Sequence, residues 1–132
     1  MVWVFLGGLL GAPARYLLEA ALPSTDSGFP VPTFVVNVLG ALALGLLLES
    51  LVLAGGFDTG VRRRLRLFLG IGFLGTFTTY SSFAVEIELL LRGDRMSLAA
   101  GYAAASLAAG LAAVALGMWA AQQLRRRRGD AR

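Results

Sequence analysis

Four long stretches of this chain contain no charged residue, and their lengths limit what the chain can fold into. They run from Met1 to Ala14, from Ser27 to Leu48, from Leu67 to Val85 and from Ser97 to Leu124, and contain 14, 22, 19 and 28 residues. A helix needs about 20 mostly apolar residues to cross the hydrocarbon core of a bilayer. The last three stretches reach this length directly, and the first reaches it if its helix continues past Arg15 to about Leu22. We therefore predict an all-α integral membrane protein with four transmembrane helices.

The composition of the chain supports this class and excludes most catalytic chemistry. Of its 132 residues, 57% are hydrophobic and 15% are charged, which is too apolar for an ordinary soluble domain. It contains no cysteine and no histidine, so disulfides, thiol nucleophiles, Ser-His-Asp triads and the usual zinc ligands are excluded. We expect no enzymatic activity.

The predicted helices occupy nearly the whole chain. We place them at about residues 2–22, 32–54, 65–91 and 97–124, within a single domain over residues 1–132 that ends in a basic tail at 125–132. The connections between them are too short to hold a nucleotide-binding domain, so pumping driven by ATP is excluded.

The 12 basic residues are all arginine, and they are distributed unevenly across the predicted topology. Four lie between the second and third helices, at positions 62, 63, 64 and 66, and five follow the fourth helix, at positions 125–128 and 132. The opposite side carries two, Arg92 and Arg95. The positive-inside rule therefore predicts cytoplasmic termini, in a multi-pass protein of the cell inner (plasma) membrane. Because basic residues at membrane ends usually contact lipid headgroups, these clusters predict contact with membrane lipid and not with nucleic acid.

The third helix carries an unusual number of polar residues for a membrane span. Between Gly70 and Phe83 it contains three glycines and five Ser or Thr residues. Glycine weakens helices, threonine has few rotamers in them, and Ser and Thr hydroxyls compete for backbone groups. We therefore predict a break near Gly75 to Thr79, because packing of small residues alone does not require five hydroxyls inside the membrane. Broken membrane helices commonly mark ion sites, since an unwound turn offers both carbonyl oxygens and hydroxyl donors.

The polar groups suit a small, strongly hydrated anion. Such an ion must exchange water for hydrogen-bond donors, and the Asn37 amide, the Tyr102 hydroxyl and the Ser and Thr hydroxyls supply them. Tyr80 and Phe83 are three residues apart on one helical face, and aromatic ring edges carry positive charge. These two rings are predicted to line a narrow anion path.

Three motifs together closely resemble the CrcB/Fluc fluoride channel family. They are Gly8-x-x-Gly11-Ala12-x-x-Arg15-Tyr16, Thr33-x-x-x-Asn37-x-x-Gly40 and Gly72-x-x-Gly75-x-x-Thr78-Thr79-Tyr80-Ser81-Ser82-Phe83. The resemblance implies a passive, fluoride-selective channel through which cytoplasmic fluoride leaves the cell. It also implies an antiparallel, dual-topology homodimer with two pores and a structural sodium ion at its centre.

The resemblance further assigns roles to individual residues. The main-chain carbonyls of Gly75 and Thr78 would hold the sodium ion, and Arg15 would lie in a vestibule near the dimer interface. The fluoride pathway would be lined by Asn37, Thr79, Tyr80, Ser81, Ser82, Phe83, Glu86, Tyr102 and Ser106.

Two features depart from the family pattern. The first pathway aromatic is usually phenylalanine but is Tyr80 here, whose hydroxyl can bond fluoride, turn the ring or narrow the pore. The nine-to-two arginine distribution is also unlike a dual-topology protein, which needs near balance. The chain is therefore predicted to prefer one orientation and to pair with an oppositely oriented paralogue as a heterodimer.

Two other functions remain open at this level. A small multidrug-resistance-type proton-coupled antiporter also has four helices, but it needs a membrane-embedded carboxylate in its first helix. Here Glu19 lies near the end of that helix, one turn from Arg15 and available to pair with it. A non-transporting membrane assembly protein would use the small residues for docking alone, and would leave Asn37 and the hydroxyls of the third helix without a role.

Overall fold

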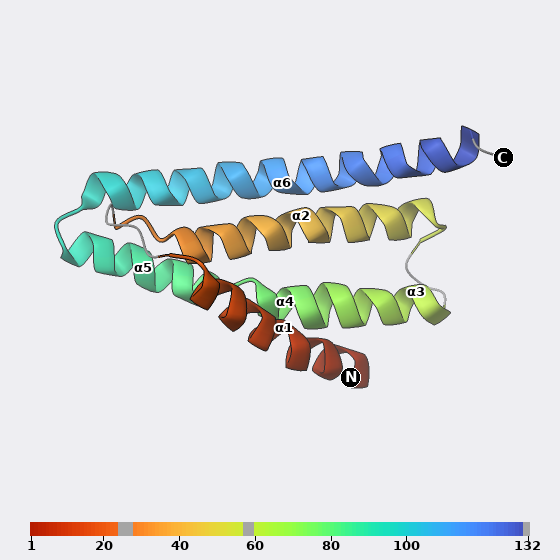
Figure 1. The fold of residues 1–132 in the computed structure, drawn as a ribbon, viewed down its shortest axis with the longest axis horizontal. Helices are drawn as coiled ribbons and strands as arrows, with labels where there is room; N and C mark the ends of the chain where they lie inside the picture. The colour runs from red at the N-terminus through yellow and green to blue at the C-terminus, as the bar shows by residue number, and fades with distance from the viewer. Residues whose placement is uncertain (24–27, 57–59, 131–132) are drawn as a thin grey trace.

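The computed structural model describes residues 1–23, 28–56 and 60–130, and every regular element within them is a helix (Figure 1). The elements are α1 (Val2–Ala21), α2 (Val31–Leu53), α3 (Gly60–Leu65), the π-helix η1 (Arg66–Leu74), α4 (Gly75–Phe77), α5 (Tyr80–Arg92) and α6 (Met96–Asp130). Elements α3, η1 and α4 follow one another without a gap, and they run beside α2 in the opposite direction (Figure 1).

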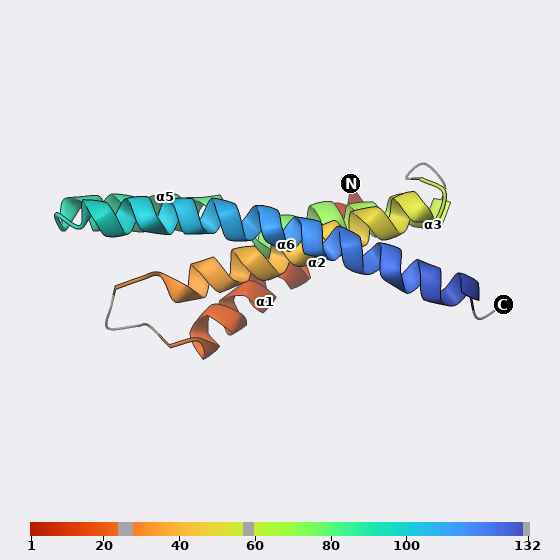
Figure 2. The ribbon, with the colours of Figure 1, turned by 90° about the horizontal axis from the view of Figure 1, so that it is seen from above.

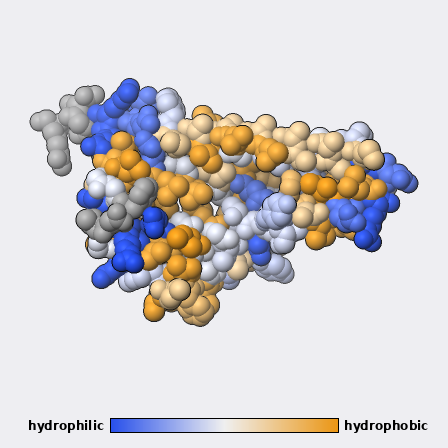
Figure 3. Space-filling model, turned by 180° about the vertical axis from the view of Figure 1, so that it is seen from behind, coloured by the Kyte–Doolittle hydropathy of each residue, from blue (hydrophilic) through white to orange (hydrophobic). Residues whose placement is uncertain are grey.

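Three helical segments are long and apolar enough to cross a membrane. They are Val31–Leu53, Gly60–Arg92 and Met96–Arg127. Apolar side chains cover much of the face shown in Figure 3, and hydrophilic residues gather at both ends of the long axis. The 20-residue helix α1 is not among these segments, and it contains Pro13, Arg15 and Glu19. The chain is a multi-pass membrane protein.

Close helix contacts are made where glycine removes the side chain. A Cβ atom on Gly72 of η1 would lie 2.6 Å from the Val4 carbonyl oxygen and 2.9 Å from Gly7 Cα, both on α1. A Cβ on Gly117 of α6 would lie 2.7 Å from the Leu46 nitrogen of α2. These positions hold two pairs of helices at backbone contact, α1 with η1 and α2 with α6, and Figure 2 shows α6 crossing α2.

The fourth predicted helix does not end where we expected. We placed its end at residue 124 and a basic tail after it, but α6 continues to Asp130, and Figure 1 shows it extending past the end of α2. Glutamine and arginine are good helix formers, and no proline follows Leu124 to stop the helix. Residues 131–132 of the predicted tail lie outside the described part of the chain.

Two extended residues separate α4 from α5. Thr78 has φ −79° and ψ 158°, and Thr79 has φ −142° and ψ 123°, so neither is helical. They lie at the end of the stretch Gly75 to Thr79, where we predicted a break. The interruption divides the apolar segment Gly60–Arg92 into two helical parts.

Candidate functional site

The side chain of Asn37, on α2, holds the backbone of the interruption. Its amide nitrogen donates to the Thr79 carbonyl oxygen at 2.9 Å, and its carbonyl oxygen accepts from the Thr79 amide at 2.8 Å. Both backbone groups of an extended residue are thus paired inside the apolar segment, where an unpaired group is costly. Thr79 itself is buried. One N–H of the Asn37 amide is left for another acceptor.

The hydroxyls after the interruption form a local cluster. Thr79 caps α5, because the Ser82 amide donates to Thr79 Oγ1 at 3.1 Å. Thr79 Oγ1 also donates to Ser82 Oγ at 3.1 Å and lies 3.1 Å from Ser81 Oγ. Three hydroxyls therefore meet at the first turn of α5.

The same hydrogen bonds take the usual helical donors away from two carbonyl groups. In a continuous helix the Thr79 amide would donate to Gly75 and the Ser82 amide to Thr78. Here the Thr79 amide donates to Asn37, and the Ser82 amide donates to the Thr79 side chain. The carbonyl oxygens of Gly75 and Thr78 are left with lone pairs that suit a small hard cation.

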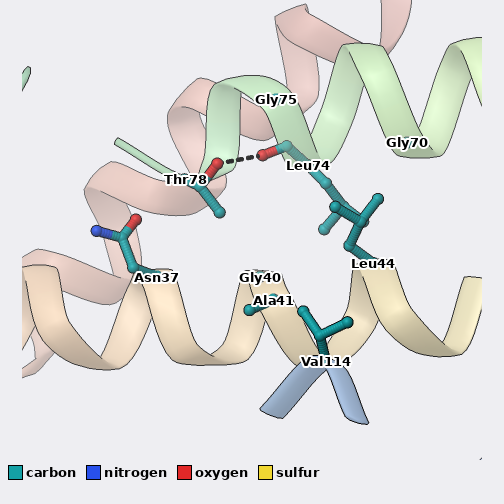
Figure 4. Close-up of a pocket in the computed structure, with 9 residues that line it drawn as sticks. All are labelled: Asn37, Gly40, Ala41, Leu44, Gly70, Leu74, Gly75, Thr78 and Val114. Atoms are coloured by element: carbon teal, nitrogen blue, oxygen red, sulfur yellow. Dashed lines mark hydrogen bonds between the residues drawn. The ribbon is translucent and has the colours of Figure 1, made fainter. Parts of the chain in front are cut away.

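A cavity of about 260 Å³ adjoins the interruption, between α2, η1, α4 and α6. Figure 4 shows Asn37 and Thr78 at one end of it, Leu44 and Gly70 at the other, and Val114 below. The Thr78 hydroxyl does not point freely into this space, because it donates to the Leu74 carbonyl oxygen at 2.9 Å. Most of the lining is apolar.

Glu86 is bound by hydroxyls from two other helices. Thr33 Oγ1 of α2 donates to Glu86 Oε1 at 2.5 Å, and the Tyr102 hydroxyl of α6 donates to Glu86 Oε2 at 2.7 Å. Both donors are buried, Thr33 to 3% and Tyr102 to 0% exposure. We predicted Glu86 as a pathway residue, and the structure gives both of its oxygens a hydroxyl donor.

An aromatic row connects this carboxylate with the interruption. The Tyr102 and Phe83 ring centroids are 5.2 Å apart, and those of Phe83 and Tyr80 are 6.0 Å apart. Phe29 packs edge-on against the other side of Tyr102, at 5.2 Å. Tyr80, which begins α5, is 80% exposed on this chain.

Ser106 and Arg15 are predicted site residues that take no part in these hydrogen bonds among the described residues. The buried Ser106 hydroxyl, one turn along α6 from Tyr102, makes no hydrogen bond within the described part of the chain. Arg15 is half-buried on α1, and none of the described residues forms an ion pair with it. Glu19, which its spacing makes available to Arg15, is not ion-paired with it among the described residues, and one Glu19 carboxylate oxygen is buried without a hydrogen bond.

The structure thus brings most of the predicted polar residues into two linked groups. One surrounds the interruption and the other surrounds Glu86, and the row from Tyr80 through Phe83 to Tyr102 joins them. Sequence reasoning missed the role of Thr33, which stood in the second motif but not among the predicted pathway residues. Its place four residues before Asn37, on the same helical face, was the available signal.

Thr76 was also missed as an interhelical contact. Its hydroxyl lies 2.9 Å from the Gly72 carbonyl oxygen, 3.1 Å from that of Phe73 and 3.3 Å from that of Gly8 on α1. This residue fixes the end of α4 against α1. Its hydrogen bonds go to carbonyl oxygens of its own helix and of α1, and not to the hydroxyl cluster.

The fold and the site together define a class. This is a small multi-pass membrane protein with an interrupted apolar span, hydroxyl and amide groups at the interruption, and a hydroxyl-bound carboxylate on the helix that follows it. The model of the family described as CrcB-like protein, Camphor Resistance (CrcB), matches residues 2–118. The chain belongs to this family, which confirms the resemblance seen in its sequence motifs.

Curated relatives match over most of their length. "Fluoride-specific ion channel FluC 2" of Leifsonia xyli subsp. xyli is 52% identical over 118 residues, covering 89% of this chain and 80% of the relative. "Fluoride-specific ion channel FluC" of Novosphingobium aromaticivorans is 40% identical over 119 residues, covering 88% and 90%. "Fluoride-specific ion channel FluC 2" of Nocardia farcinica is 42% identical over 119 residues, covering 90% and 82%.

Proposed function

We propose that this protein is a passive, fluoride-selective channel that lets cytoplasmic fluoride leave the cell and so lowers its toxicity. Its relatives in the CrcB family are named as fluoride-specific ion channels. The observation that carries the proposal is the interrupted span, whose backbone is bonded to Asn37 and whose hydroxyls gather at one turn of α5. Helix packing alone does not account for an interrupted span with polar groups inside the membrane.

The proposed pathway follows the polar and aromatic groups from the interruption to α6. Its members are the predicted residues Asn37, Thr79, Tyr80, Ser81, Ser82, Phe83, Glu86, Tyr102 and Ser106. A fluoride ion that loses its water needs several donors in succession, each weak enough to release it. The free N–H of Asn37, the α5 hydroxyls and the unbonded hydroxyl of Ser106 can supply such donors. Arg15 would raise the anion concentration at a vestibule.

Glu86 has a different role in this pathway, because a carboxylate repels anions. In the structure Thr33 and Tyr102 donate hydrogen bonds to Glu86, so fluoride would compete with Glu86 for these two hydroxyls. A donor that changes partners as the ion passes keeps the site satisfied when the ion has left. The carboxylate would therefore prevent buried hydroxyls from holding the ion permanently.

A structural sodium ion fits the carbonyl oxygen ligands available at the interruption. The carbonyl oxygens of Gly75 and Thr78 have lost their usual helical donors, and hard cations prefer oxygen ligands. Bound there, sodium would supply positive charge beside the main-chain carbonyl groups of Gly75 and Thr78. No cluster of three or more acidic, Cys or His residues suited to a metal occurs among the described residues, so main-chain oxygens are the proposed ligands.

Sodium is expected to stabilise the purified protein. Because a ligand that binds only the native state raises its stability, replacing potassium by sodium at equal ionic strength should raise the midpoint of thermal unfolding by several degrees. Lithium and N-methylglucamine serve as further comparison cations in the same detergent. A midpoint that is the same in sodium and in potassium would contradict the sodium site.

We further propose an antiparallel dimer with two pores. Gly75, Tyr80 and Ser81 are exposed near the middle of the segment Gly60–Arg92, where lipid would leave polar groups unsatisfied. A second chain covers them in this proposal, and α1 acts as the fourth membrane span. The partner is another copy of this chain or an oppositely oriented paralogue.

The arginine distribution makes a paralogue the expected partner. Figure 1 places α3 and the C-terminal end of α6, which carry arginine clusters, at one end of the molecule, and the turn after α5 at the other. Single-cysteine labelling of both termini in intact cells is expected to find them mostly in the cytoplasm. Comparable inward and outward populations would instead support the homodimer.

The function is tested with purified protein in proteoliposomes. A fluoride electrode follows efflux while valinomycin clamps the membrane potential, and a chloride electrode serves as the control. Rapid loss of fluoride without chloride is expected, either from this chain alone or after coexpression of a paralogue. No fluoride loss in either preparation, from folded protein, would refute the channel. Proton-coupled drug efflux from the same vesicles would favour the antiporter.

A further inference from the structure

An apolar cluster lies between Glu86 and the nearer end of the molecule. At 1.5 Å per residue, Glu86 is about 9 Å along the helix axis from Arg92, where α5 ends. The side chains that pack together here are the buried Leu90, Ala99 and Tyr102 and, against them, the partly buried Phe29, Phe34, Phe83, Ile87 and Leu98. An ion that leaves Glu86 toward this end must therefore pass the cluster.

Phe29 is the member of this cluster that precedes α2 and belongs to no helix. Its ring packs edge-on against Tyr102, with centroids 5.2 Å apart and planes at 86°, and at 5.5 Å and 69° against Phe34. Tyr102 is 0% and Thr33 3% exposed, so the two hydroxyls that donate to Glu86 are both shielded from water. Burial within one chain is kept when a second chain binds.

The backbone on both sides of Phe29 holds it in this place. Gly28 has φ +74°, which favours glycine, and a Cβ there would collide with the guanidinium of Arg95, on the turn between α5 and α6. Figure 1 shows the start of α2 and this turn at the same end of the molecule. Pro30 follows with a fixed φ, and the Val31 amide donates to the Phe29 carbonyl oxygen at 2.8 Å. The ring can turn aside without unwinding a helix.

We propose that the Phe29 side chain closes this end of the pathway and is a specificity-determining residue of the channel. Its role in ion flux rests on the proposed function. An apolar constriction excludes water and stays closed to an ion that keeps its hydration shell. Fluoride is small, and immediately behind the ring it can exchange water for the hydroxyls of Thr33 and Tyr102. Chloride is larger and needs the ring to move further.

Two measurements on Phe29→Ala and Phe29→Leu test this closure, with Phe5→Ala as the control. Phe5 lies on α1 and is 67% exposed. The first measurement is fluoride and chloride flux in proteoliposomes, with a coexpressed paralogue if this chain alone is silent. The second needs no flux. Ala99→Cys, at a position 2% exposed in the cluster, introduces a thiol into a chain that has no cysteine. Its reaction with a charged methanethiosulfonate reagent reports the access of water.

We expect the Ala99→Cys thiol to react about tenfold to a hundredfold faster when Phe29→Ala is added, which is the free energy of burying one phenylalanine expressed as a rate. Chloride flux should rise relative to fluoride flux in the same variant. Phe29→Leu keeps most of the side-chain volume, so it and Phe5→Ala should stay close to the wild type in both measurements.

An unchanged thiol rate in Phe29→Ala overturns the closure. A faster thiol reaction with unchanged selectivity between fluoride and chloride overturns the role in specificity. If size-exclusion chromatography shows that Phe29→Ala does not fold, Phe29→Val replaces it with the same expected directions. A wild type that carries no fluoride refutes the proposed function, and the thiol measurement then decides the closure by itself.

Discussion

Fluoride efflux is expected to fall by about 100-fold or more in the variant Asn37→Ala. The alanine leaves the amide and the carbonyl of Thr79 without partners inside the membrane. Each unsatisfied group costs about 1–3 kcal/mol, so the extended conformation of Thr79 loses its advantage over a continuous helix. The change is measured as the initial rate of fluoride loss from proteoliposomes at matched protein content.

Two further variants separate this effect from general damage. Leu39→Ala removes an exposed side chain two residues away on α2 and is expected to keep wild-type efflux. Asn37→Asp keeps an acceptor for the Thr79 amide but loses the donor to the Thr79 carbonyl. Its fluoride efflux is therefore expected to be slower than that of the wild type. Wild-type efflux in Asn37→Ala, with folding shown by size-exclusion chromatography, would contradict the role of the amide.

Replacement of Phe83 by isoleucine is expected to reduce fluoride efflux to the leak of protein-free vesicles. The ring lies 5.2 Å from Tyr102 and 6.0 Å from Tyr80, and it joins the two polar groups of the site. Isoleucine fills part of the volume but has no aromatic edge to offer an anion. The measurement is again initial efflux, with chloride followed in parallel.

The matched control is Phe5→Ile, because Phe5 lies on α1 and is 67% exposed. It should leave efflux unchanged. Phe83→Tyr keeps the ring and is expected to retain a substantial part of the flux. If Phe83→Ile conducts like the wild type, the pathway does not follow the aromatic row.

The class of the protein was accessible from sequence because it depends on local properties. Apolar length identifies helices that can cross a membrane, and three motifs in order identify the CrcB family, which the family match confirms. The excess of glycine and hydroxyl residues directed attention to the segment from Gly75 to Thr79, because those residues weaken a helix wherever they occur.

The position of the interruption depends on a contact that no local pattern contains. Asn37 precedes Thr79 by 42 residues, and the hydrogen bonds between them decide which residues become extended. The π-helix η1 is likewise a tertiary feature, because it lies where α1 meets Gly72 at backbone distance. Sequence indicated small residues at this point but not a change of helical type.

The partners of Glu86 were beyond sequence reasoning for the same reason. Thr33 and Tyr102 are 53 and 16 residues from Glu86 along the chain, so no local pattern pairs them with it. The end of α6 was misplaced for a different reason. Loss of apolar character marks the end of a membrane span, but polar helix formers continue the helix beyond it.

The hydrogen bonds between Asn37 and Thr79 also constrain how the chain is assembled. During synthesis α2 emerges before the residues of α4 and α5, so the side chain that satisfies the extended backbone is already present when that backbone enters the membrane. A segment inserted without α2 would meet lipid with two unpaired groups and would favour a continuous helix. The order of helices along the chain thus lets the interruption form as the segment Gly60–Arg92 arrives, without a later rearrangement.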